Sequence, residues 1–149
     1  MQSMTKWHHT SLAVSNVDEA IAFFSAAFGF ETILDERDVI QTISRMAGLP
    51  GLSCHLVQLR SPEIDQVLEL IEFCHAEKTF PTIRDRPVGV GAAHICFHVD
   101  DLYATLSRIE AVGAKKVGEI TRFDEGFSVY CWVPGGAYIE VEQMNMEKV

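Results

Sequence analysis

The chain has 149 residues, enough for one well-packed domain or for two small modules that share a core. Hydrophobic residues make up 48% and charged residues 22% of the sequence, and no apolar run is long enough to span a membrane. The formal net charge of −9 opposes binding to phosphate backbones, and no basic stripe compensates for it. The N-terminus also lacks the basic and apolar segments of a signal peptide. We therefore expect a cytoplasmic protein that binds neither nucleic acid nor membrane.

The cysteines are widely spaced and do not form C-x-x-C pairs. They lie in or beside apolar, strand-like runs, where reduced thiols act as small hydrophobic side chains. This pattern favours buried thiols over a disulfide framework or a zinc knuckle for Cys54, Cys74, Cys96 and Cys131.

The first predicted elements are a strand over residues 7–14 and a helix that begins at Asn16. Glu19 follows three residues after Asn16, which forms a capping-box pattern, and Gly29 ends the helical pattern. The helix has an apolar stripe at helical spacing, which predicts core residues at Val17, Ala20, Ile21, Phe24 and Phe28.

A second strand is predicted over residues 30–34, and an insertion with helical spacing follows over residues 38–51. This insertion is the main difference between the two halves of the chain. It could form a lid over a pocket, in which case Arg45 and Met46 are the candidate residues to contact a ligand, or it could cover the edge of a sheet. Two further strands, over residues 54–59 and 67–73, complete the first half.

Residues 74–90 are predicted to connect the first half, residues 7–73, to a second half that covers residues 91–143. The second half contains a similar series of elements: a strand over 94–99, a helix over 102–111, and strands near 116–120, over 128–132 and over 138–143.

The two halves are therefore copies of one β-α-β-β-β unit. In each copy a histidine near the start of the first strand is followed five residues later by a valine, at His9 and Val14 and again at His94 and Val99. One face of the sheet in such a unit is covered by its helix, and the other face is free. Two copies side by side predict a concave sheet surface.

Each half ends with a strand that carries a glutamate among apolar residues, Glu69 in the first and Glu140 in the second. Such a carboxylate is costly to bury unless it is paired or bound to a cation. Together with His9 and His94, the glutamates form a donor set suited to a divalent transition metal. Because strand residues alternate between faces, His8 and His9 cannot both point into one site. Taken singly, each of the four residues could instead be an ordinary structural or solvated side chain.

Four segments, HHTSLAVSNVDEAIAFFSAAFGF, LELIEF, HICFHVDDL and VPGGAYIEVEQ, together give the chain its resemblance to the vicinal oxygen chelate superfamily. This group includes glyoxalase I, methylmalonyl-CoA epimerase, extradiol dioxygenases, and fosfomycin-resistance and bleomycin-binding proteins. The resemblance implies a single domain over residues 1–149 of the α+β class. Its two tandem βαβββ modules would form a cup-shaped, incompletely closed eight-stranded sheet with the helices outside.

The resemblance also implies that His9, Glu69, His94 and Glu140 hold a divalent metal ion (Zn, Ni, Co, Mn or Fe), within one chain or across a homodimer. The turn Val133-Pro-Gly-Gly departs from the Asp-Pro-x-Gly of many members, and we expect it to affect only a turn.

A carboxylate at Glu69 favours the glyoxalase and epimerase branch, because extradiol dioxygenases use two histidines and one glutamate. The expected function is that of a metal-dependent lyase or isomerase acting on a small carbonyl compound or its thiol conjugate, with Glu69 and Glu140 as candidate bases. The alternatives are an iron(II)-dependent extradiol-type dioxygenase and a non-catalytic resistance protein that binds a small molecule.

Overall fold

The structure is a computed structural model that describes residues 5–80 and 91–145. The first half of the chain contains β1 (His9–Ala13), α1 (Val17–Phe28), β2 (Glu31–Val39), α2 (Gln41–Ala47), β3 (Leu52–Ser61) and β4 (Ile64–His75). The second half contains β5 (Ile95–His98), α3 (Leu102–Glu110), β6 (Lys115–Lys116), β7 (Thr121–Phe123), β8 (Gly126–Val133) and β9 (Ala137–Met144). The predicted α+β class with two tandem βαβββ units is confirmed. The predicted connection over residues 74–90 lies partly outside the described residues.

The strands form two mixed sheets, one from each half, and the described residues do not form one continuous eight-stranded sheet. The first sheet has the order β1-β4-β3-β2, and the second has the order β5-β9-β8-β6 with β7 also paired to β8. In each sheet the first strand runs parallel to the last, and the remaining pairs are antiparallel. A single strand was predicted near residues 116–120, but this part of the chain forms two short strands, β6 and β7, with Gly118 between them.

Local capping explains why the two helices begin at equivalent places. The Asn16 side chain accepts a hydrogen bond from the Glu19 amide at 3.0 Å, and the Asp101 side chain accepts one from the Ala104 amide at 2.9 Å. Gly29 ends α1 in the left-handed conformation, with φ of 68°. These contacts confirm the helix start and stop predicted for the first half.

The last strand of each sheet supplies a second acceptor to the start of the helix. The Val17 amide donates to the Glu72 carboxylate at 2.9 Å, and the Leu102 amide donates to the side-chain oxygen of Gln143 at 2.8 Å. Glu72 and Gln143 occupy matching places in the repeat. The two halves thus share this contact to the helix start, but the acceptor is a charged carboxylate in the first half and a neutral amide in the second.

One hydrophobic core joins the two halves. Its buried residues come from α1 and α3 and from the faces of both sheets that these helices cover. Phe28 and Phe97 stack across the junction, with ring centroids 4.1 Å apart and an angle of 8° between the planes. In the predicted stripe of α1, Val17 and Phe24 are buried, while Phe28 is partly buried against the same core.

The turn after β8 also belongs to the junction. The Ser15 amide donates to the Gly135 carbonyl at 2.8 Å, and a Cβ atom at Gly135 would lie 2.6 Å from the Ala20 Cβ atom of α1. Gly135 has φ of 93°, which glycine adopts without strain. The sequence Val133-Pro-Gly-Gly therefore does more than form a turn, because it allows the second half to pack against the first helix.

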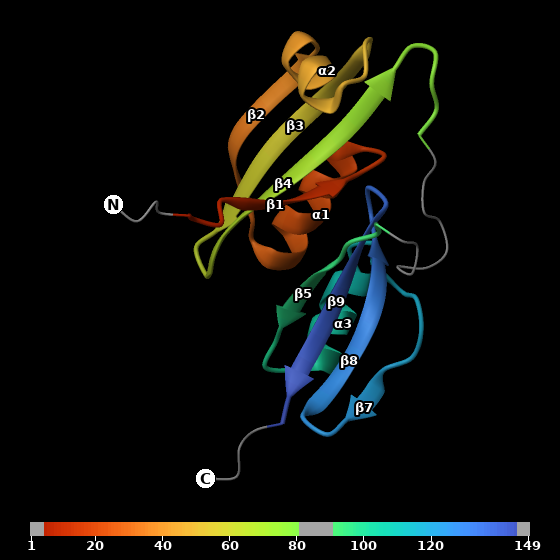
Figure 1. Cartoon of the computed structure of the whole chain (residues 1–149). Helices are drawn as coiled ribbons and strands as arrows, with labels where there is room; N and C mark the ends of the chain where they lie inside the picture. The colour runs from red at the N-terminus through yellow and green to blue at the C-terminus, as the bar shows by residue number, and fades with distance from the viewer. Residues whose placement is uncertain (1–4, 81–90, 146–149) are drawn as a thin grey trace.

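Figure 1 shows the two sheets one above the other, with the helices α1 and α3 on the side away from the viewer. The opposite face of each sheet is the one that can carry a site. None of the described helices is long and apolar enough to cross a membrane.

The insertion predicted over residues 38–51 forms the end of β2 and the short helix α2, which packs against β3. Gly48 ends α2 with φ of 63°, and no residue of α2 is buried. Met46 is 77% exposed. Whether this insertion acts as a lid stays a prediction.

Candidate metal site

Strand pairing places the predicted ligands at equivalent positions in the two sheets. On the first sheet Ser11 lies opposite Glu69, and on the second sheet Cys96 lies opposite Glu140. In each case the histidine is two residues before the residue opposite the glutamate, and therefore on the same face of the sheet. We call His9 with Glu69 the first half-site and His94 with Glu140 the second half-site.

In the first half-site, Nε2 of His9 lies 3.5 Å from Oε2 of Glu69. Glu69 is only 7% exposed, and the side-chain amide of Gln58 donates to the same carboxylate oxygen at 3.0 Å. The ring nitrogens Nδ1 of His8 and His9 lie 2.7 Å apart. A buried carboxylate whose partners are an imidazole and a neutral amide is a suitable ligand for a divalent cation.

In the second half-site, Nε2 of His94 lies 3.1 Å from Oε2 of Glu140. The Ser128 hydroxyl donates to the other oxygen of this carboxylate. The Tyr130 ring meets the His94 ring edge to face, with centroids 4.9 Å apart. These contacts orient the carboxylate and the imidazole, as the hydrogen bonds around metal ligands commonly do.

The structure therefore forms both His–Glu pairs, but it does not bring the four residues together in one chain. Among the described residues, only Cys96, Glu140 and Glu142 form a group of three or more potential ligands whose donor atoms lie within 4.8 Å of one another. The reason is the packing of the two halves. They meet through α1 and the turn at Gly135, and no strand of the first sheet pairs with a described strand of the second.

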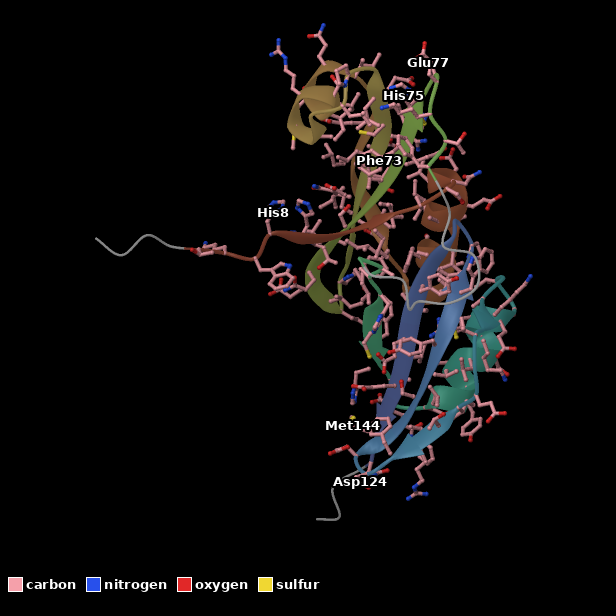
Figure 2. All side chains as sticks on the ribbon, turned by 45° about the vertical axis from the view of Figure 1, so that its right-hand side comes forward. His8, Phe73, His75, Glu77, Asp124 and Met144 are labelled. Carbon is pink, nitrogen blue, oxygen red and sulfur yellow. The ribbon has the colours of Figure 1, made fainter. Side chains whose placement is uncertain are left out.

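The sheet faces around the two half-sites have different chemical character. Beyond Glu69 on β4 lie Ile71, which is buried, and Phe73, whereas Glu142 and Met144 follow Glu140 on β9. Figure 2 labels Phe73 on the first sheet and Met144 on the second, and each lies four residues after the glutamate of its half-site. The first face is mainly apolar, and the second is acidic.

The acidic residues of the second face change the pKa of Cys96, the cysteine on that face. Partial burial and the negative charges of Glu140 and Glu142 raise the pKa of the Cys96 thiol to about 12. Without a bound cation this thiol is therefore protonated near neutral pH and is a poor nucleophile. All the cysteines are free, as predicted, although Cys74 is only half-buried and Cys96 is exposed.

Three residues that contact the two half-sites were not predicted from the sequence: Gln58, Ser128 and Tyr130. Gln58 lies directly opposite Glu69 in the hairpin of β3 and β4, and Tyr130 lies directly opposite Glu140. The register of each hairpin would have identified both residues. His8 lies just before β1, which begins at His9, and whether only one of the two histidines can be a ligand stays a prediction.

Comparison with known proteins supports this description of the fold. The model of the Glyoxalase/Bleomycin resistance protein/Dioxygenase superfamily matches residues 8–143. A search of curated protein sequences finds no significant match.

Among solved structures, a glyoxalase family protein from Bacillus cereus is 23% identical, with a TM-score of 0.80 and coverage of 97% of each chain. A mutant of the fosfomycin resistance protein FosX from Listeria monocytogenes, in complex with Mn(II) and 1S,2S-dihydroxypropylphosphonic acid, is 18% identical. Its TM-score is 0.62, and the match covers 97% of this chain and 94% of that one. Lactoylglutathione lyase from Agrobacterium tumefaciens is 23% identical, with a TM-score of 0.60 and coverage of 95% and 96%.

Proposed function

Because this chain belongs to the glyoxalase/bleomycin resistance protein/dioxygenase superfamily, we propose that it is a metal-dependent lyase or isomerase of the glyoxalase and epimerase type. Its reaction moves a proton on the carbon next to the carbonyl group of a small molecule. The observation that carries this proposal is the pair of half-sites, each with an imidazole beside a carboxylate at matched positions of two sheets.

The proposed metal ligands are His9, Glu69, His94 and Glu140. Two imidazoles and two carboxylates suit a borderline divalent cation such as Zn, Ni, Co, Mn or Fe, and leave positions for substrate or water in six-coordinate geometry. When bound, the metal would polarise the substrate carbonyl and stabilise negative charge on its oxygen.

Proton transfer is assigned to Glu69 and Glu140, which can act from opposite sides of a planar intermediate. Glu69 is buried and accepts a hydrogen bond from Gln58, so its carboxylate is held in place. Glu140 is held by Ser128 and faces His94. Carboxylates with fixed positions can remove and return a proton without a large rearrangement.

A complete shell requires a second chain in this proposal. Each half-site lies on a different sheet, and among the described residues His9 and Glu69 do not form one group of close donor atoms with His94 and Glu140. A cytoplasmic homodimer can join the first half-site of one protomer to the second half-site of its partner. Two equivalent shells would result, one for each chain.

The first test measures metal binding. We expect purified wild-type protein to bind a divalent metal, and Glu69→Gln and Glu140→Gln each to weaken that binding by about tenfold or more. Glu31→Gln, on the exposed edge strand β2, is the matched control and should bind metal as wild type does. Unchanged affinity in both site variants would overturn the proposed shell.

The second test measures proton transfer in deuterated water with the hemithioacetal of a small 2-oxoaldehyde. We expect metal-dependent incorporation of deuterium, reduced by about 100-fold or more in Glu140→Gln. Iron(II)-dependent oxygen uptake with a catechol would instead assign the protein to the dioxygenases. Tight ligand binding after complete metal removal, without turnover, would instead indicate a binding protein.

A further inference from the structure

A second cluster of metal-binding side chains lies next to the second half-site. His94, Cys96 and His98 face the same side of the sheet as Glu140 and Glu142, because residues two apart on a strand share a face. Cys96 lies opposite Glu140 and His98 lies opposite Glu142 in the parallel pairing of β5 and β9. From its place in the sequence, Cys96 was expected only to pack as a small hydrophobic side chain.

The donor atoms of this cluster are close together. The sulfur of Cys96 and one oxygen from each of Glu140 and Glu142 lie within 4.8 Å of one another. Nδ1 of His98 lies 3.6 Å from Oε1 of Glu142, at the end of the cluster away from His94. Ligand atoms of a tetrahedral zinc site are about 3.5 Å apart, so small rotations of Cys96, Glu140 and Glu142 would bring their donor atoms around one ion. His98 lies outside this group of three and would join it by a larger rotation.

The charge of the cluster is not neutralised by basic side chains. In the described part of the chain, the ion-pair partners of Glu140 and Glu142 are His94 and His98, and neither carboxylate pairs with a lysine or an arginine. A divalent cation would balance these carboxylates and would also stabilise the thiolate form of Cys96.

The cluster is also specific to the second half. The equivalent positions in the first half are occupied by Ser11, Ala13 and Ile71 in place of Cys96, His98 and Glu142. These residues cannot supply an equivalent set of ligands. The cluster is therefore not a by-product of the repeat that produced the two His–Glu pairs.

We propose that Cys96 and Glu142, with Glu140 and His98, bind a second divalent cation of the thiophilic class, such as Zn²⁺, Co²⁺ or Cd²⁺. A site with sulfur, oxygen and nitrogen donors favours these ions over Mg²⁺ or Ca²⁺. It lies within one protomer and needs neither His9 nor Glu69. The Glu140 carboxylate, with its two oxygens, lies between this site and the second half-site.

The test is titration of the metal-free protein with Co²⁺, followed by ultraviolet absorption and by equilibrium dialysis. A cysteine ligand produces a thiolate-to-cobalt charge-transfer band. We expect the wild type to show this band, and Cys96→Ser to lose it and to bind one Co²⁺ fewer per chain. Cys74→Ser is the matched control, because Cys74 is a half-buried thiol on β4, and it should keep the band.

Two further variants separate this site from the proposed catalytic shell. The double variant His9→Ala/Glu69→Gln should keep the charge-transfer band, although it no longer binds the metal of the catalytic shell. Glu142→Gln should lower the affinity of the Cys96 site for Co²⁺ by about tenfold or more. The proposal would be overturned if the wild type shows no band at saturating Co²⁺, or if Cys96→Ser keeps the band. It would also be overturned if Glu142→Gln binds the Co²⁺ of this site as tightly as the wild type does. If the wild type shows the band but binds only one Co²⁺ per chain, the result supports this site and contradicts the proposed shell of His9, Glu69, His94 and Glu140.

Discussion

The two halves of the chain have the same His–Glu pair but present it on different surfaces. Around Glu69 the open face of the first sheet continues with Ile71 and Phe73, and around Glu140 that of the second sheet continues with Glu142 and Met144. The repeat thus preserves the backbone, the helix caps and the ligand pair, while the neighbouring side chains have diverged. A pocket completed by both faces would have an apolar wall and an acidic wall.

The largest effect on stability should come from placing an acidic residue on the apolar face of the first sheet. Ile71 is 6% exposed, so Ile71→Glu would bury an unpaired carboxylate close to Glu69. We expect a loss of about 3 kcal/mol or more in the free energy of unfolding, measured by urea denaturation. Glu142→Ile, the reverse exchange, should cost less than about 1 kcal/mol, because Glu142 is already partly exposed. Equal effects would show that the two faces are not different environments.

The junction between the halves should be the next most sensitive feature. Gly135→Ala would place a Cβ atom 2.6 Å from the Ala20 Cβ atom, at a residue with φ of 93°. We expect a loss of about 1–3 kcal/mol in the free energy of unfolding. Gly118→Ala is the control, since a Cβ atom there meets nothing within 4 Å, and it should change stability by less than about 0.5 kcal/mol. A neutral Gly135→Ala would mean that the halves can separate at this point.

The helix caps of the two halves should contribute equally to the free energy of unfolding. Asn16→Ala and Asp101→Ala each remove an acceptor from the first turn of a helix, and each should cost about 1 kcal/mol in denaturation experiments. Because one core joins both halves, we also expect a single unfolding transition in both variants. Two separate transitions would contradict the shared core.

The smallest predicted effect concerns the second acceptor at each helix start. A carboxylate near a helix N-terminus interacts favourably with the helix dipole, so Glu72→Gln should cost about 0.3–1 kcal/mol. Gln143→Glu should stabilise α3 by a similar amount, since Gln143 already accepts from the Leu102 amide. Thermal unfolding at low salt is the measurement. Destabilisation by Gln143→Glu would show that its acidic surroundings outweigh the dipole.

Much of the fold could be predicted because the relevant signals are local. The cap at Asn16, the end of α1 at Gly29 and the alternating strands depend on residues a few positions apart. The matched offsets of His9 and His94, and of Glu69 and Glu140, likewise predicted both pairs that the structure forms. The division of the predicted strand near residues 116–120 into β6 and β7 was not foreseen, since two or three residues carry no periodic pattern.

The sequence by itself therefore determined the order of elements, the repeat and the two His–Glu pairs, because each follows from spacing along the chain. Only the tertiary structure decided what surrounds those pairs. Hairpin register places Gln58 beside Glu69, and the parallel pairing of β5 and β9 places Cys96 beside Glu140 and Glu142. The hydrogen bond to Gly135 and the stack of Phe28 on Phe97 join the halves, and the two half-sites lie on different sheets. These contacts join residues far apart in sequence, so they depend on the packing of whole sheets and helices.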